Sequence, residues 1–176
     1  MCGRFTASFE LREIKLLFNL QRDIPLFARR YNIAPSQEVP VIVQNNGANE
    51  VKSMRWGLVP SWAPDPSIGN RMINARAETI TEKPSFKRLV QQRRCLIPAN
   101  GFYDWRTEGK GKVPVWIHLK NREPFAFAGL WECGAMRKAI PSIRSRSLRP
   151  CPMLCFDPYA GDLRQAVSQA VARPDV

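Results

Sequence analysis

The sequence predicts one α+β domain in which strands dominate and helices are few. Three observations lead to this fold class. A chain of 176 residues fits a single domain, and a protein of about 150 residues buries roughly 70% of its unfolded surface. Apolar residues alternate with other types in several short segments, whereas helical spacing is confined to a few stretches. The 44% apolar content, without any run of about 20 apolar residues, excludes the disordered and membrane-spanning classes.

Two segments are predicted to form amphipathic helices. Over residues 8–20, apolar side chains recur at helical spacing, and two glutamates lie near the positive N-terminal end. The apolar face of this segment consists of Leu11, Ile14, Leu17 and Phe18. Pro84 begins the second helix, because the N–H that proline lacks would be unpaired at that position. The apolar residues that follow it on one face are Phe86, Leu89 and Val90.

Strands are predicted around an Asn45-Asn46-Gly47 turn and in the middle of the chain. An Asn-Gly pair allows the positive φ angles of a tight hairpin turn, and apolar residues flank it on both sides. Prolines and a glycine make residues 59–72 a loop. Further strands are expected at 94–98, 101–106, 113–120 and 125–131. From residue 132 onward the sequence shows no clear period and no strand pattern, apart from a weak helical signal over 164–172.

The charge of the chain predicts a polyanionic partner. Lys and Arg number 27 against 15 Asp and Glu, which gives a formal net charge of +12. Neutralising phosphates with such cations releases counterions, so nucleic acid is the favoured partner, although a basic surface that serves only solubility is the alternative. The N-terminus has no secretory signal pattern, and five cysteines fit no disulfide framework. We therefore expect a cytoplasmic protein with free thiols.

Cys2 is the most informative candidate for chemistry. Removal of Met1 would turn it into a 1,2-aminothiol, whose amine forms a Schiff base with an aldehyde before the thiol closes a five-membered thiazolidine. Model α-amino groups titrate near ~8 and thiols near ~8.5, so both nucleophilic forms exist at neutral pH, and Arg4 would favour the thiolate. The alternative is that the Met-Cys start is accidental. An abasic site in DNA offers such an aldehyde when its deoxyribose ring opens.

Aromatic and cationic residues predict how single-stranded DNA would be held. Such binders combine cations for phosphates with aromatics on which bases stack. The stretch that offers both contains Arg55, Trp56, Trp62, Arg71 and Arg76. Trp56 alternates with apolar neighbours and is expected in the core. Trp62, among prolines, is the better stacking candidate, with packing inside its own loop as the alternative.

Two polar residues are weaker candidates for the reaction. The amide of Asn74 would donate to a reacting oxygen, but a turn or strand-edge role is the alternative. Asp104 is flanked by aromatics, where desolvation would raise its pKa and suit it to acid/base work; otherwise it is an exposed strand-end carboxylate. No metal and no cofactor is expected. His118 is the single histidine, Cys133, Cys151 and Cys155 are irregularly spaced, and no phosphate-binding glycine motif occurs.

Six segments in order resemble the SOS response-associated peptidase family, also called abasic-site processing proteins. They are MCGRF (1–5), RYNIAP (30–35), RWGLVPSWA (55–63), INARAET (73–79), RRCLIPANGFYDW (93–105) and FAFAGLW (125–131). The resemblance implies a compact α+β fold with a curved, barrel-like, mainly antiparallel sheet and a few short helices. It divides the chain into a family-like domain, 1–131, and a divergent segment, 132–176, which is part of that domain or an altered end of it.

The resemblance also implies a function. Cys2, after self-removal of Met1, would crosslink covalently to abasic sites in single-stranded DNA. Asn74 would orient the reacting sugar, and Asp104 stands where the family has its acid/base glutamate. Arg4 and Arg76 would hold phosphates, and Trp62 would pack beside the lesion. We expect a monomer without membrane contacts.

Two departures from the family pattern keep an alternative open. Asp104 is one methylene shorter than the usual glutamate. The family's catalytic histidine, in a His-x-Arg-Met-Pro-like motif, has no match after Trp131, and His118 precedes that point. A shifted reading frame or degeneration of the end would account for this. The alternatives are therefore a non-catalytic single-stranded DNA-binding protein, a degenerate family member, or an unstable product.

Overall fold

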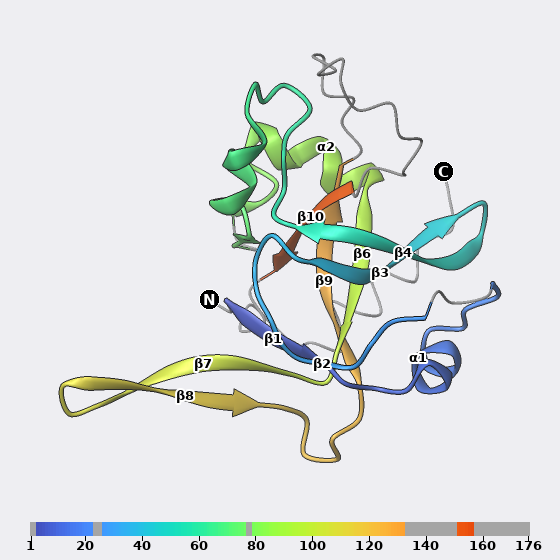
Figure 1. Ribbon diagram of the computed structural model, residues 1–176. Coiled ribbons are helices and arrows are strands. Elements are labelled where there is room, and N and C mark those ends of the chain that lie inside the picture. The colour runs from blue at the N-terminus through green and yellow to red at the C-terminus, as the bar shows by residue number, and fades with distance from the viewer. Residues whose placement is uncertain (1–2, 23–25, 77–78, 133–150, 157–176) are drawn as a thin grey trace, which may run out of the picture.

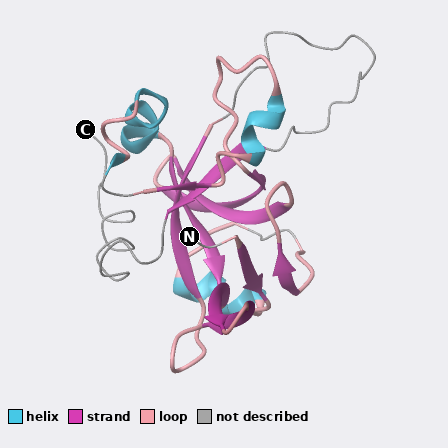
Figure 2. Ribbon diagram, turned by 90° about the vertical axis from the view of Figure 1, so that its left-hand side faces the viewer, coloured by secondary structure: helices cyan, strands magenta, loops and turns pink. Residues whose placement is uncertain are grey.

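Ten strands, two α-helices and one 3-10 helix make up the part of the chain that the structure, a computed structural model, describes: residues 3–22, 26–76, 79–132 and 151–156 (Figure 1). In chain order they are β1 (Arg4–Ala7), α1 (Leu11–Leu17), β2 (Arg30–Ile33), β3 (Glu38–Asn45), β4 (Ala48–Trp56), η1 (Pro66–Asn70), β5 (Asn74–Ala75), α2 (Pro84–Gln92), β6 (Arg94–Ala99), β7 (Gly101–Glu108), β8 (Gly111–Ile117), β9 (Phe125–Trp131) and β10 (Cys151–Phe156). Figures 1 and 2 place α1 at the opposite end of the molecule from α2 and η1.

The strands form two sheets. A four-stranded antiparallel sheet has the order β2-β1-β7-β8, and a six-stranded sheet has the order β4-β3-β6-β9-β10-β5. In the second sheet β10 also pairs with β4 in parallel, so the pairing runs from β4 through β3, β6, β9 and β10 back to β4. The pairings among β3, β4, β6 and β9 are all antiparallel. The predicted α+β fold with a curved, barrel-like, mainly antiparallel sheet is confirmed.

Aromatic side chains join the two sheets. Phe5 of β1 is fully buried and meets the rings of Trp56 and Phe127 edge to face, at centroid distances of 5.2 and 5.8 Å. Phe102 of β7 packs on Phe127 at 5.9 Å. Such T-shaped pairs are favourable beyond the area they bury. The core therefore lies between the sheets, and Trp56 belongs to it, as its alternation with apolar neighbours predicts.

The first helix is shorter than the predicted segment. Glu10 and Glu13 form a capping box at its start, in which the Glu10 N–H donates to the Glu13 carboxylate at 2.7 Å. Ile14 and Phe18 are buried, but Leu17 is 55% exposed, so its predicted place on the apolar face is wrong. At 100° per residue, Leu17 lies about 90° from the direction that Leu11, Ile14 and Phe18 share.

The hairpin and the second helix agree with their sequence signals. Asn46 and Gly47 adopt φ angles of 50° and 76°, and β3 pairs with β4 up to Asn45↔Ala48. Pro84 begins α2, whose Phe86 and Leu89 are buried. The predicted terminal helix over 164–172 lies outside the described residues. Residues 151–156, which show no strand pattern, nevertheless form β10 between β9 and β5.

Candidate active site

The start of β1 carries the first candidate residue. Arg4 pairs with Tyr103 across β1 and β7, and its Nη1 donates to Asn32 Oδ1 at 2.9 Å. Neighbouring strands thus fix the backbone and the guanidinium of an exposed cation. Cys2 lies two positions before Arg4 in the sequence and outside the described residues, so its role stays a prediction.

Buried contacts link β1 to Asn74. Phe5, the residue after Arg4, packs on Trp56. The Trp56 indole N–H in turn donates to the carbonyl of Ile73 at 2.8 Å. Asn74 follows Ile73 directly and is half-buried at the start of β5. The structure therefore holds Arg4 and Asn74 in a fixed relation through one core tryptophan.

The loop before Asn74 is held at its base by two glycines. Gly57 has a φ of 125°, and a Cβ there would lie 2.4 Å from the carbonyl oxygen of Gly69, so only glycine allows this approach. The Leu58 N–H donates to the Met72 carbonyl at 2.8 Å across the same base. The predicted loop contains the 3-10 helix η1. Its two ends are thus fixed to each other.

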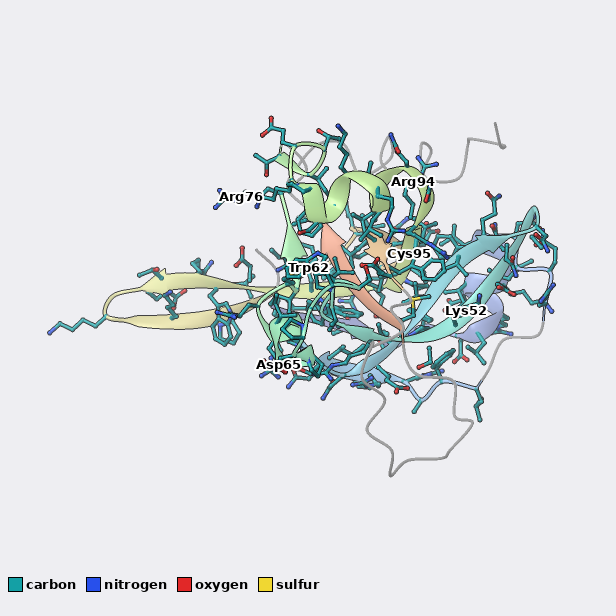
Figure 3. All side chains as sticks on the ribbon, turned by 90° about the horizontal axis from the view of Figure 1, so that it is seen from above. Lys52, Trp62, Asp65, Arg76, Arg94 and Cys95 are labelled. Atoms are coloured by element: carbon teal, nitrogen blue, oxygen red, sulfur yellow. The ribbon has the colours of Figure 1, made fainter. Side chains whose placement is uncertain are left out.

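Trp62 lies at the outer part of this loop. The Ala63 N–H donates to the Pro60 carbonyl at 2.9 Å, so Trp62 is the third residue of a tight turn. Its side chain is 65% exposed, in contrast with Trp56. Figure 3 shows Trp62 and Arg76 toward the side of the molecule from which the β7–β8 hairpin extends. A ring packed inside its own loop, which is the alternative to stacking, would be largely buried, and the Trp62 ring is not.

A buried carboxylate that the sequence analysis missed contacts the Trp62 turn. Glu132 follows β9 and is 6% exposed. Its carboxylate accepts from the Ser61 N–H at 3.2 Å and from Arg88 of α2 at 2.5 Å. A glutamate after a strand has no sequence signal that separates it from a surface residue. The long sequence separations of its partners hide the contact from any local pattern.

Asp104 lies on β7 beside the Arg4 pairing. It is half-buried and pairs with Val115 of β8. One oxygen of its carboxylate accepts a hydrogen bond from the backbone N–H of Trp105, the next residue, at 2.9 Å. Trp105, one of the two aromatic residues that flank it in the sequence, is 52% exposed. The pairing places Asp104 one residue from the strand position that faces Arg4.

Arg76 is the last of the predicted site residues, and His118 is the single histidine of the sequence. Arg76 is exposed just after β5, two residues beyond Asn74. His118 follows β8, stacks on Trp116 at 4.3 Å between centroids, and its Nδ1–H donates to the Leu119 carbonyl at 2.7 Å. It thus has a local packing role. Within the described ranges, no three His, Cys, Asp or Glu side chains gather closely enough to hold a metal ion.

Perturbed groups outside this site have structural causes. Burial raises the pKa of the Cys95 thiol, which keeps it protonated and unreactive. Hydrogen bonds from Ser67 lower the pKa of Asp65, which caps η1. No helix in the described part of the chain is long and apolar enough to span a bilayer.

Comparison with known proteins agrees with this arrangement. The sequence model of the family described as SOS response associated peptidase (SRAP) matches residues 1–150. The chain belongs to this family. The SRAP match extends past Trp131, where the sequence motifs end, and covers most of the described fold. How residues 132–176 relate to the domain stays a prediction.

Several relatives of this SRAP chain have names that state their role. The abasic site processing protein YoqW of Bacillus subtilis (strain 168) is 47% identical over 135 residues, which cover 75% of this chain and 60% of that protein. YoaM of the same organism, also named an abasic site processing protein, is 42% identical over 161 residues, or 90% of this chain and 68% of its own length. The matched part thus spans about three fifths to two thirds of these relatives.

Solved structures support the SRAP fold. A protein from Bacteroides thetaiotaomicron has a TM-score of 0.72 at 25% identity, with 88% of this chain and 67% of that chain covered. A phage-related protein from Bordetella bronchiseptica has a TM-score of 0.66, also at 25% identity, with 88% and 68% covered.

Proposed function

We propose that this protein processes abasic sites in single-stranded DNA by forming a covalent crosslink through Cys2. Relatives at 42–47% identity are named abasic site processing proteins. The single observation that carries the proposal is the buried link Phe5–Trp56–Ile73, because it fixes the strand that follows Cys2 relative to Asn74. A reaction between an N-terminal nucleophile and a sugar needs its orienting group held in place to within about 1 Å.

The chemistry of Cys2 proceeds in two balanced steps. The free α-amine attacks the aldehyde carbon of the ring-opened deoxyribose, and loss of one water gives an imine. The thiolate then attacks the imine carbon, a C–S bond forms, and the nitrogen takes up a proton. The product is a thiazolidine, and the net loss is one water molecule.

The other candidate residues have distinct roles in this proposal. Asn74 donates its amide N–H to the sugar oxygen. Asp104 moves a proton during loss of water from the carbinolamine. Arg4 and Arg76 are exposed cations and hold the phosphates that flank the abasic site. Trp62 packs beside the lesion through its exposed ring.

The crosslink requires prior removal of Met1. Hydrolysis of the Met1–Cys2 peptide bond consumes one water and releases methionine, which frees the amine that the first step uses. The family description as a peptidase agrees with this cleavage. We further propose that the protein acts as an intracellular monomer and that its DNA partner carries the abasic site.

A non-catalytic DNA-binding protein is the second candidate. The observation that favours it is the absence of histidine after Trp131, since the only histidine in the sequence is His118. In that case the cations and Trp62 still bind single strands, but with the shorter carboxylate of Asp104 and without that histidine no crosslink forms.

One experiment separates the two candidates. Protein with Met1 removed is incubated with an abasic single-stranded oligonucleotide and with an undamaged one, and denaturing gels are compared with native binding. Crosslinking predicts a denaturation-resistant band with the abasic strand that Cys2→Ala abolishes. Equal native binding by both proteins without any resistant band supports the non-catalytic candidate instead.

A further inference from the structure

Glu132 connects three segments that are far apart in the sequence. Its side chain is 8% exposed and lies between the turn at Ser61, which is 71 residues away, and Arg88 of α2, which is 44 residues away. Each carboxylate oxygen has one of these partners. A buried carboxylate is costly unless it is paired and hydrogen-bonded, so the fold specifies this contact.

The Ser61 contact holds the turn that carries Trp62. Ser61 and Trp62 are the two central residues of the Pro60–Ala63 turn. Glu132 accepts from the Ser61 N–H, which belongs to the Pro60–Ser61 peptide unit at the start of the turn. The turn is thus held from inside, and the indole that it carries is 65% exposed.

We infer that Glu132 is a positioning residue that sets the Trp62 ring for contact with the abasic strand. The inference rests on the proposed function, in which Trp62 packs beside the lesion. Arg88 supports Glu132 by neutralising its charge from α2. A preorganised aromatic binds DNA more tightly than a mobile one, because less conformational freedom is lost on binding.

Glu50 offers a matched control for this role. It too is a buried carboxylate held by exposed cations, Arg22 at 3.0 Å and Lys52 at 2.8 Å. It lies on β4, and none of its bonded partners is in the Trp62 turn. Glu132→Ala and Glu50→Ala each leave a cation without its carboxylate, so both should show any general loss of stability. An effect on Trp62 is expected only for Glu132→Ala.

The first test measures affinity in a double-mutant cycle, for a single strand whose abasic site is a tetrahydrofuran analogue without an aldehyde, so that no crosslink forms. Glu132→Ala is expected to weaken binding up to about tenfold, because the released turn and its tryptophan must then be ordered on binding, and Glu50→Ala to leave it within about twofold. Glu132→Gln, which keeps an oxygen for the Ser61 N–H, should retain most of the affinity. In a Trp62→Ala background, Glu132→Ala should have no further effect, because the two residues act as one unit.

The second test needs no DNA. Amide hydrogen exchange at Ser61 is expected to be about tenfold faster in Glu132→Ala, after correction for global stability, and unchanged in Glu50→Ala. Unchanged exchange at Ser61, or effects of Glu132→Ala and Trp62→Ala on DNA affinity that simply add, would overturn the inference. If wild type itself shows no preference for the abasic strand, the proposed function fails and the positioning role falls with it. If wild type prefers the abasic strand and Glu132→Ala has the same affinity for it, the positioning role fails while the proposed function stands.

Discussion

The indole N–H of Trp56 donates to the carbonyl of Ile73 at 2.8 Å, deep in the core and one residue before Asn74. This bond joins β4 to the start of β5. It therefore connects the stability of the fold with the placement of the amide that we assign to the reacting sugar.

Trp56→Phe should destabilise the protein and slow the reaction together. The smaller ring leaves a void and an unpaired Ile73 carbonyl, which we expect to lower the free energy of unfolding by about 2 kcal/mol. Asn74 then loses its anchor, so the crosslinking rate should fall as well. Denaturant unfolding and single-turnover crosslinking measure the two effects. Trp105→Phe, at an exposed ring, should leave the unfolding free energy within about 0.5 kcal/mol. An unchanged crosslinking rate in folded Trp56→Phe would contradict the assigned link.

Gly57→Ala tests the base of the Trp62 loop. The added methyl group meets the Gly69 carbonyl oxygen at 2.4 Å, and φ is 125°, so strain and steric clash combine. We expect a loss of about 3 kcal/mol in unfolding free energy. Gly47 has a φ of 76° and open space around it, so Gly47→Ala should cost only about 1 kcal/mol. Thermal or denaturant unfolding compares them, and equal losses would mean that backbone conformation alone matters.

Asp104→Glu tests whether the short carboxylate limits the reaction. The extra methylene restores the reach that is usual in the family, and a misplacement near 1 Å costs on the order of 100-fold in rate. We therefore expect faster crosslinking in Asp104→Glu and slower crosslinking in Asp104→Asn, measured as adduct formed per unit time. A slower Asp104→Glu protein would show that Asp104 is already at the right distance or has no part in proton transfer.

Acid sensitivity should have a contribution from Glu50. Its hydrogen bond with Lys52 and the nearby positive charges lower its pKa in the folded state. The ionised Glu50 therefore stabilises the folded state fully above the pKa that it has in the unfolded chain, about 4.3. This stabilisation is lost as the pH falls below that value and through the lower pKa of the folded state. Glu50→Gln should remove this part of the pH dependence, on the order of 1 kcal/mol. Urea unfolding between pH 3 and pH 7 measures it, and parallel curves for both proteins would refute the assignment.

Local signals predicted much of the fold. Asn46-Gly47 set the hairpin because both residues must adopt positive φ, and Pro84 marked the start of α2 by its missing N–H. Leu17 was misplaced because α1 ends there, and only the face formed by Leu11, Ile14 and Phe18 reaches the sheet. β10 carries no alternation, since its place depends on pairing with β4, β5 and β9.

Motifs indicate candidate site residues, whereas contacts between distant segments leave no local signal in the sequence. Asn74, Arg76 and Trp62 lie in family-like segments; Asn74 is half-buried and the other two are exposed, and their roles stay predictions. Glu132 has no such signal, because its partners Ser61 and Arg88 come from other parts of the chain. Only the folded arrangement distinguishes this glutamate from a solvated one.

Intact mass spectrometry detects the proposed covalent bond between Cys2 and an abasic site. Protein lacking Met1 is reacted with a single-stranded oligonucleotide that carries one abasic site. We predict a species whose mass is the sum of protein and DNA less one water, absent with Cys2→Ala and with undamaged DNA. If folded, Met1-free protein gives no such species, or if Cys2→Ala gives an equal amount of it, Cys2 does not form the proposed bond.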